Sequence, residues 1–173
     1  MQKSPGFTIV EIIIVCVVVA ILASIGIVSW SATLRNSRDD VRASEHKDWA
    51  KRFETFRSKN TVYPNANDSG VAITGEHCLG TGFPSGRCKG GGSPITENAT
   101  STIMQQLAKV GTLPIYKHTA ARGYVGPWVQ FITGTPGAIR VYHSYENTDC
   151  PTGITKDTSY AGATICYIEF TKN

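Results

Sequence analysis

Residues 6–28 read GFTIVEIIIVCVVVAILASIGIV, and this segment is apolar apart from one charged side chain. The 22 consecutive positions from Phe7 to Val28 contain a single charge, that of Glu11. In an α-helix, which rises about 1.5 Å per residue, they would extend roughly 33 Å, and the hydrocarbon core of a bilayer is about 30 Å thick. The sequence therefore predicts a helix that is able to cross a membrane.

The helical pattern continues beyond this segment, but with apolar residues on one side only. No proline occurs between Pro5 and Pro64. At about 100° per residue, six apolar side chains fall within an arc of about 140°. These side chains are Trp30, Leu34, Val41, Trp49, Phe53 and Phe56. We therefore expect one long helix over about 7–59, whose second half packs under a folded domain, with Gly26 as its weakest point.

The remainder of the chain, residues 61–173, is rich in Gly, Pro, Asn, Ser and Thr. We expect a long irregular loop over 61–92 and a short helix over 100–110, capped by Thr100 or Ser101. Alternating apolar side chains predict three strands, with a turn at 134–137 joining the first two. The strands are expected at 128–133, 138–144 and 164–171. The predicted fold class is α+β: a long N-terminal helix packed against a small antiparallel sheet.

Four of the five cysteines lie in this polar part of the chain, at Cys78, Cys88, Cys150 and Cys166. They favour two disulfides over a zinc site, because no Cys-x-x-Cys pair occurs. Four cysteines permit three connectivities, of which we favour pairing between sequence neighbours. Disulfides persist in oxidising compartments, so this part is expected to face outward. Cys16, inside the apolar segment, is interpreted as a small apolar residue.

The start of the chain resembles a known processing site. Residues 1–6 form a short leader with Lys3, and Gly6 is followed by Phe7, by Glu11 four residues later, and by an unbroken apolar helix. This combination resembles the N-terminus of type IV prepilins and pseudopilins over about residues 3–28. The resemblance implies that a membrane-embedded peptidase cuts between Gly6 and Phe7 and methylates the new amino group of Phe7. An ordinary secretory signal is not indicated, because the apolar segment is too long and no Ala-x-Ala site follows it.

Glu11 has a physical interpretation that is independent of the family. An isolated charge deep in a bilayer costs about 2.5 to 3.5 kcal/mol, so this carboxylate needs a partner or a shallow position. Cleavage after Gly6 would create a cation, the amino group of Phe7, that could meet Glu11 of a neighbouring copy. Opposite charges about 4 Å apart attract by about 4 kcal/mol at an effective dielectric near 20, before desolvation. We expect Glu11 to set the register of assembly; the alternative is that it lies near the lipid headgroups.

These observations predict a leader at 1–6, a transmembrane and filament-core helix at 7–28, an amphipathic stalk at 29–60 and a globular head at 61–173. By resemblance, the chain would be a structural subunit of a type IV pilus that supports adhesion, motility or DNA uptake. The alternatives are a pseudopilin of a type II secretion or competence system, and a minor tip pilin that binds a ligand or DNA.

The expected partners follow from the same interpretation. They are further copies of the chain in a helical filament, the prepilin peptidase, the pilus assembly machinery and the membrane, with DNA or a host surface as further possibilities. Before assembly the chain would be a single-pass protein of the cytoplasmic membrane with its head outside, and afterwards part of an extracellular filament. The basic residues Arg35, Arg38 and Arg42 follow the apolar segment, and the positive-inside rule alone would favour the reverse orientation.

Other chemistry is weakly indicated. The spacing of Asn65, Asn67, Ser69 and Glu76 approaches that of a calcium loop, but only Glu76 supplies a carboxylate, so a polar surface turn is favoured. We therefore expect no metal and no cofactor.

The four histidines are scattered, and no Ser or Cys stands in a recognisable nucleophile context, so no enzyme activity is expected. The net charge of +4 is modest, and residues 61–173 carry 8 basic against 7 acidic residues, which does not favour a dedicated nucleic-acid binder. If the head binds a ligand, the candidate contacts are Arg87, Lys89, Arg122 and Arg140.

Overall fold

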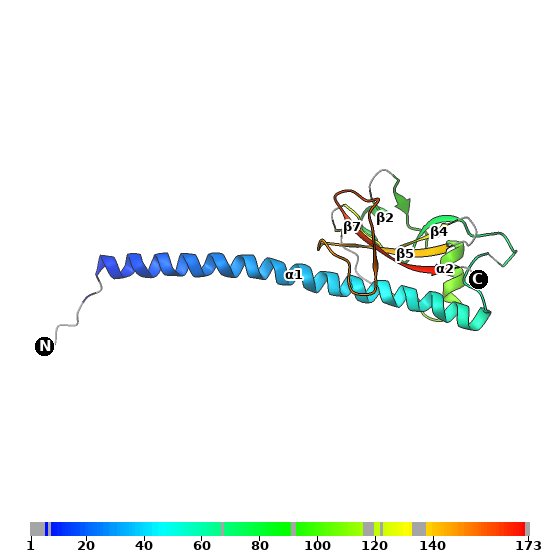
Figure 1. Ribbon diagram of the computed structural model, residues 1–173, viewed down its shortest axis with the longest axis horizontal. Helices are drawn as coiled ribbons and strands as arrows, with labels where there is room; N and C mark the ends of the chain where they lie inside the picture. Colours follow the sequence, from blue (N-terminus) through cyan, green and yellow to red (C-terminus); the bar gives the residue numbers. More distant parts are fainter. Residues whose placement is uncertain are drawn as a thin grey trace. The chain divides into compact units, whose positions relative to one another are not determined.

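The computed structural model describes residues 6, 8–66, 68–90, 93–115, 120–121, 123–132 and 138–171, without the side chains of 26–29. The chain divides into two compact units, Met1–Ser37 and Arg38–Asn173. Helix α1, Ile9–Asn60, belongs to both units (Figure 1). Its residues up to Ser37 lie in the first unit, and the remainder is the first element of the second unit. Its 52 residues contain no proline, and the expected single helix over about 7–59 is confirmed within one or two residues of its ends.

The second unit contains a five-stranded antiparallel sheet in the order β1-β4-β5-β7-β6. Its strands are β1 (Gly75–Cys78), β4 (Trp128–Ile132), β5 (Ala138–Tyr145), β6 (Thr155–Asp157) and β7 (Thr164–Thr171). Figure 1 shows β5 and β7 lying along the second half of α1. The α+β fold class and the three expected strands are therefore confirmed, while the expected turn at 134–137 lies outside the described residues.

The main core lies between this sheet and α1. Trp49 and Phe53 of α1 are fully buried, and the Phe53 ring stacks on Phe170 of β7 with centroids 5.8 Å apart. Val129 on β4 and Val141 on β5 belong to the same buried cluster. The alternation that predicted the strands thus places their apolar side chains against the helix.

The expected apolar stripe of α1 is only partly correct. Trp49, Phe53 and Phe56 are buried, whereas Trp30, Leu34 and Val41 are 67%, 40% and 54% exposed. In the second unit the inward positions continue instead through polar residues at alternating spacings of three and four. These positions are Asp39, Arg42, His46, Trp49, Phe53 and Phe56. Val41 falls beside this row and therefore points away from the sheet.

The expectation of an irregular loop over 61–92 holds for most of the described residues of that segment and is wrong for part of it. It contains β1, the one-turn helix η1 (Pro84–Gly86) and β2 (Arg87–Lys89), and β2 pairs with β3 (Ile95–Thr96). β1 is an edge strand of the main sheet and pairs with β4. Residues 75–78 form a strand because their backbone pairs with β4, although their composition does not favour a strand.

The expected short helix is present as α2, Thr102–Ala108, with Ser101 as its N-cap residue. Its side chains Ile103, Met104 and Leu107 are buried in the main core. A second apolar cluster includes Phe83, Trp128, Tyr142 and Ile165. Trp128 and Tyr142 stack face to face with ring centroids 5.2 Å apart. A third, smaller cluster holds Tyr145, Ile154 and Cys166, so the described apolar core of the head consists of three clusters.

Candidate processing and assembly site

The first turn of α1 is closed by reciprocal hydrogen bonds between Thr8 and Glu11. The carboxylate oxygen Oε2 of Glu11 accepts the backbone N–H of Thr8 at 2.8 Å and its hydroxyl at 2.7 Å. The backbone N–H of Glu11 donates to the hydroxyl oxygen of Thr8 at 3.3 Å. This is a capping box, which satisfies N–H groups that an α-helix leaves without partners at its start. The sequence analysis did not predict this capping box. Its signal is nevertheless present, because Thr8 and Glu11 form a Thr-x-x-Glu pattern at the start of the apolar segment.

The two residues of the expected cleavage site are described unequally. Gly6 is described and exposed, whereas Phe7 lies outside the described residues. Glu11 is also exposed, and no ion pair joins it to any residue that the structure describes. The capping hydrogen bonds occupy Oε2, so the carboxylate retains acceptor capacity on its other oxygen. The expected pairing of Glu11 with an amino group of another copy stays a prediction.

The apolar side chains of α1 in the first unit form an exposed surface. Its large hydrophobic residues from Ile9 to Ile25 are between 48% and 79% exposed. Such an extended apolar surface is typical of a segment that contacts lipid or another protein. The best 18-residue window of α1 has a mean hydropathy of 3.1, so by length and composition this helix can cross a membrane.

The four head cysteines form two disulfides in the structure. Cys78 joins Cys88, and Cys150 joins Cys166, the neighbouring pairs that the sequence favoured. The first bond connects β1 to β2, and the second connects the segment before β6 to β7. Cys16 is a free, exposed cysteine of α1.

The weak calcium candidates do not gather around an open carboxylate. Both oxygens of Glu76 accept hydrogen bonds from the Lys89 ammonium, at 2.6 and 2.7 Å. Asn65 and Ser69 are exposed, and Asn67 lies outside the described residues. An ammonium therefore occupies the place where a cation would meet the one carboxylate of the set.

The candidate ligand contacts of the head are dispersed and partly engaged. Besides pairing with Glu76, Lys89 is buried, with its ammonium 5.9 Å from the Trp128 ring centroid. Arg140 pairs with Glu169 at 2.5 Å and lies over the Tyr167 ring. Arg87 is exposed, and Arg122 lies outside the described residues. Two of the four candidates thus have structural partners within the head.

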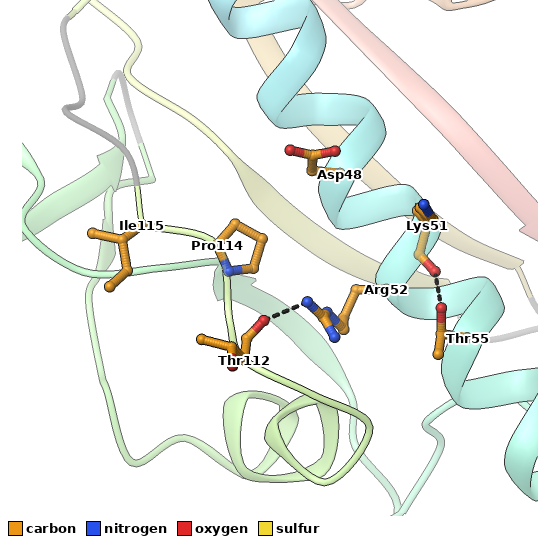
Figure 2. Close-up of a pocket in the computed structure, with 7 residues that line it drawn as sticks. All are labelled: Asp48, Lys51, Arg52, Thr55, Thr112, Pro114 and Ile115. Atoms are coloured by element: carbon orange, nitrogen blue, oxygen red, sulfur yellow. Dashed lines mark hydrogen bonds between the residues drawn. The ribbon is translucent and has the colours of Figure 1, made fainter.

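A pocket of about 480 Å³ lies in the second unit between α1 and the segment 112–115 (Figure 2). Its lining comprises Asp48, Lys51, Arg52, Thr55, Thr112, Pro114 and Ile115. Arg52 reaches across from α1 and donates a hydrogen bond to the carbonyl of Thr112, as Figure 2 shows. The lining offers two cations, one carboxylate and threonine hydroxyls, and the arginine ties the segment to the helix.

Comparison with known proteins bears on the N-terminal region. Residues 1–27 match the family model of the prokaryotic N-terminal methylation motif. This match covers Gly6, Phe7, Thr8 and Glu11 and most of the apolar segment. No curated protein and no solved structure matches the chain. Sequence similarity therefore supports the processing motif in residues 1–27. The fold of the head is described by the structure alone.

Proposed function

We propose that this chain, whose first 27 residues carry the signature of type IV pilins and pseudopilins, is a structural subunit of a type IV pilus filament. The observation that carries the proposal is the combination of this motif with the exposed apolar surface of α1 and a disulfide-braced α+β head. Its work is assembly rather than catalysis, and it uses no cofactor or metal.

Processing prepares the helix for assembly. Prepilin peptidase cleaves between Gly6 and Phe7 and methylates Phe7, which removes the leader and leaves a cationic amino group one residue before Thr8. The capping box holds the Glu11 carboxylate at the same end of the helix. Pairing of this carboxylate with the amino group of a neighbouring copy neutralises both charges in an apolar surrounding and fixes the axial register.

Assembly then exchanges lipid for protein around α1. Before assembly, residues 7–28 hold the chain in the cytoplasmic membrane with the head outside, where the two disulfides are stable. In the filament, the apolar surface of α1 packs against the same surface of other copies. The exchange itself gains packing between helices rather than hydrophobic burial, because lipid tails are already apolar. Outside the membrane, the packed helices keep their apolar side chains away from water, and this stabilises the assembled filament.

A pseudopilus uses the same motif, and the head structure favours the surface pilus. Two disulfides and internal ion pairs brace the head, as suits a domain that stays exposed outside the cell. Adhesion, motility or DNA uptake would be functions of the assembled filament.

Two measurements test this proposal. Mass spectrometry of the chain purified from its own membranes should find residues 1–6 absent and a methyl group on Phe7. Electron microscopy of filaments sheared from cells should find long filaments that contain the chain. An intact N-terminus would refute the proposal; correct processing without long filaments would favour a pseudopilin.

A further inference from the structure

A cluster of ionisable side chains is buried in the second unit, between α1 and β5. All members are at most 6% exposed. They are Asp39, Arg42, Glu45 and His46 from α1, and His143 and Tyr145 from β5. We call this set the α1–β5 polar cluster. Buried polar groups need hydrogen-bond partners. The positions of the donors and acceptors in the cluster therefore determine which of its groups carry a proton.

Both ring nitrogens of His143 face hydrogen-bond acceptors. Nε2 lies 3.1 Å from Oε2 of Glu45, and Nδ1 lies 3.1 Å from the carbonyl oxygen of Ser144. A neutral imidazole carries only one N–H, so it can serve only one of these acceptors. The second contact requires a further proton, held either on the imidazole or on the Glu45 carboxyl group.

His46, in contrast, is satisfied as a neutral ring. Its Nε2 lies 2.8 Å from the carbonyl oxygen of Val141 and so donates to it. Its Nδ1 lies 3.1 Å from the hydroxyl of Tyr145 and can accept from that group. Burial lowers the pKa of His46 to about 3, and the hydrogen bond to the Val141 carbonyl only partly offsets this shift.

We propose that Glu45 and His143 share one buried proton at neutral pH. This proton stabilises the contact between α1 and β5, so the stability of the head falls at alkaline pH. With the proton present, each contact has one donor and one acceptor. Without it, either Nε2 faces a bare carboxylate as two acceptors, or Nδ1 faces the Ser144 carbonyl in the same way. Loss of the proton therefore weakens a buried link between helix and sheet.

The surroundings indicate where the proton resides. Burial lowers the pKa of His143 to about 3; the hydrogen bond to the Ser144 carbonyl and the charge of Asp39 act against this shift, and the charge of Arg42 acts with it. The imidazolium form is thus disfavoured, so in this proposal the shared proton lies between Oε2 of Glu45 and Nε2 of His143, which are 3.1 Å apart, while Nδ1–H donates to the Ser144 carbonyl. Tyr145 contributes a neutral phenol, since burial raises its pKa well above the ordinary value.

The other elements around His143 add little charge. Segment 123–127 packs over it so closely that a Cβ at Gly126 would lie 3.0 Å from Nδ1, and Tyr124 is its one titratable residue. On β7 the residue opposite His143 is the disulfide-bonded Cys166. Beyond β5, Glu146 is held by Arg38 and Arg42. The charged side chains that act on His143 are therefore those of the α1–β5 polar cluster itself, Arg42 and Asp39.

The direction of the pH dependence follows from proton counts. The folded pair keeps one proton, whereas in the unfolded chain the last proton of the two side chains leaves with a pKa of about 6.5, that of free histidine. The folded form therefore binds more protons above pH 6.5, and stability falls as the pH rises. The contribution is fully present near pH 6.5 and is lost toward the pH at which the folded pair releases its proton.

The test uses thermal unfolding of the full-length chain in detergent micelles between pH 6.5 and 9, followed by near-ultraviolet circular dichroism. The wild-type melting temperature should fall by roughly 5 to 10 °C over this range. In Glu45→Gln the carboxamide donates to Nε2 without a proton to lose, so the fall should shrink below about 2 °C. Asp40→Asn, at an exposed position of the same helix, should behave like the wild type.

A second measurement keeps the proposal testable if Glu45→Gln fails to fold. In the wild-type chain with nitrogen-labelled histidine, the His143 ring signals, assigned by their loss in His143→Gln, should show a protonated Nδ1 at pH 7. They should change with a midpoint above pH 6.5. Equal alkaline falls in wild type and Glu45→Gln, or His143 signals that stay constant from pH 6.5 to 9, would overturn the proposal.

Discussion

Asp39 of α1 binds the backbone of Glu146, whose N–H lies 2.9 and 3.1 Å from the two carboxylate oxygens of Asp39. The next backbone N–H, of Asn147, also donates to Asp39, at 2.8 Å. Arg42 pairs with Asp39 at 2.8 Å and with Glu146 at 3.0 Å. A helical carboxylate thus anchors the segment that leaves β5.

Asp39→Ala should destabilise the head by about 2 to 4 kcal/mol, because it removes the acceptor of two backbone N–H groups and one of the carboxylates that pair with the buried Arg42. Denaturant unfolding of the full-length chain in detergent measures this loss. Asp40→Ala, which removes an exposed carboxylate from the next position, should change stability by no more than about 0.5 kcal/mol. Equal effects of the two substitutions would contradict the anchoring role.

The corrected helix face can be tested with two apolar truncations. Phe53→Ala removes a fully buried ring that stacks on Phe170, and it should cost about 3 to 5 kcal/mol. Val41→Ala, at an exposed position, should cost less than about 0.5 kcal/mol. The same unfolding measurement applies, and a large effect at Val41 would restore the original prediction of the stripe.

Acidification should weaken the head through its buried neutral histidine. Burial lowers the pKa of His46 to about 3, while the unfolded residue titrates near 6.5. The unfolded chain therefore binds more protons below pH 6.5, and stability falls with pH from there toward 3. Melting temperatures between pH 6.5 and 5 should drop less in His46→Gln than in wild type. His77→Gln, on β1 at the sheet edge, serves as the matched control and should keep the wild-type slope.

The disulfide between Cys150 and Cys166 spans a sequence separation of 16 residues. In the chain-entropy account, opening a loop of this size costs about 3 kcal/mol. The double substitution of both cysteines by serine should show this loss in denaturant unfolding. Cys16→Ser, at the free cysteine of α1, is the control and should leave the stability of the head unchanged.

The two functions of Glu11 can be separated by substitution. Glu11→Gln retains an oxygen that can accept from Thr8 but removes the charge, so filaments should be lost while membrane insertion persists. Thr8→Ala removes the capping hydroxyl and retains the charge, so it should weaken the first helical turn by about 1 kcal/mol and still allow filaments. The measurement is the yield of sheared filaments relative to the amount of chain in membranes. This ratio should fall in Glu11→Gln and stay near the wild-type value in Thr8→Ala. Normal filaments in Glu11→Gln would refute the charge-pairing account.

The sequence predicted those elements whose apolar residues follow a regular period. β7 was expected at its observed bounds, 164–171, and α1 nearly so, because alternation and helical spacing report burial directly. The inward positions Asp39, Arg42 and His46 were missed because apolarity was the criterion. Extending the spacing of Trp49, Phe53 and Phe56 backward by threes and fours would have found them.

Long-range partners could not be predicted in this way. β1 carries the residues Gly-Glu-His-Cys, which lack a strand signal, and it is a strand because β4 pairs with it. The contact of Glu45 with His143 joins residues 98 positions apart, and each alone suggests a solvated surface group. The capping box of Thr8 and Glu11, in contrast, is local and was readable from four letters of sequence.

The head depends on the position of β7 in its sheet. This strand follows all the other described elements in sequence, yet it pairs on one side with β5 and on the other with β6. Without residues 164–171, neither β5 nor β6 would have its β7 partner, and Cys150 would have no Cys166 to bond with. The sheet and the second disulfide therefore depend on the same strand, so that loss of β7 would remove both at once.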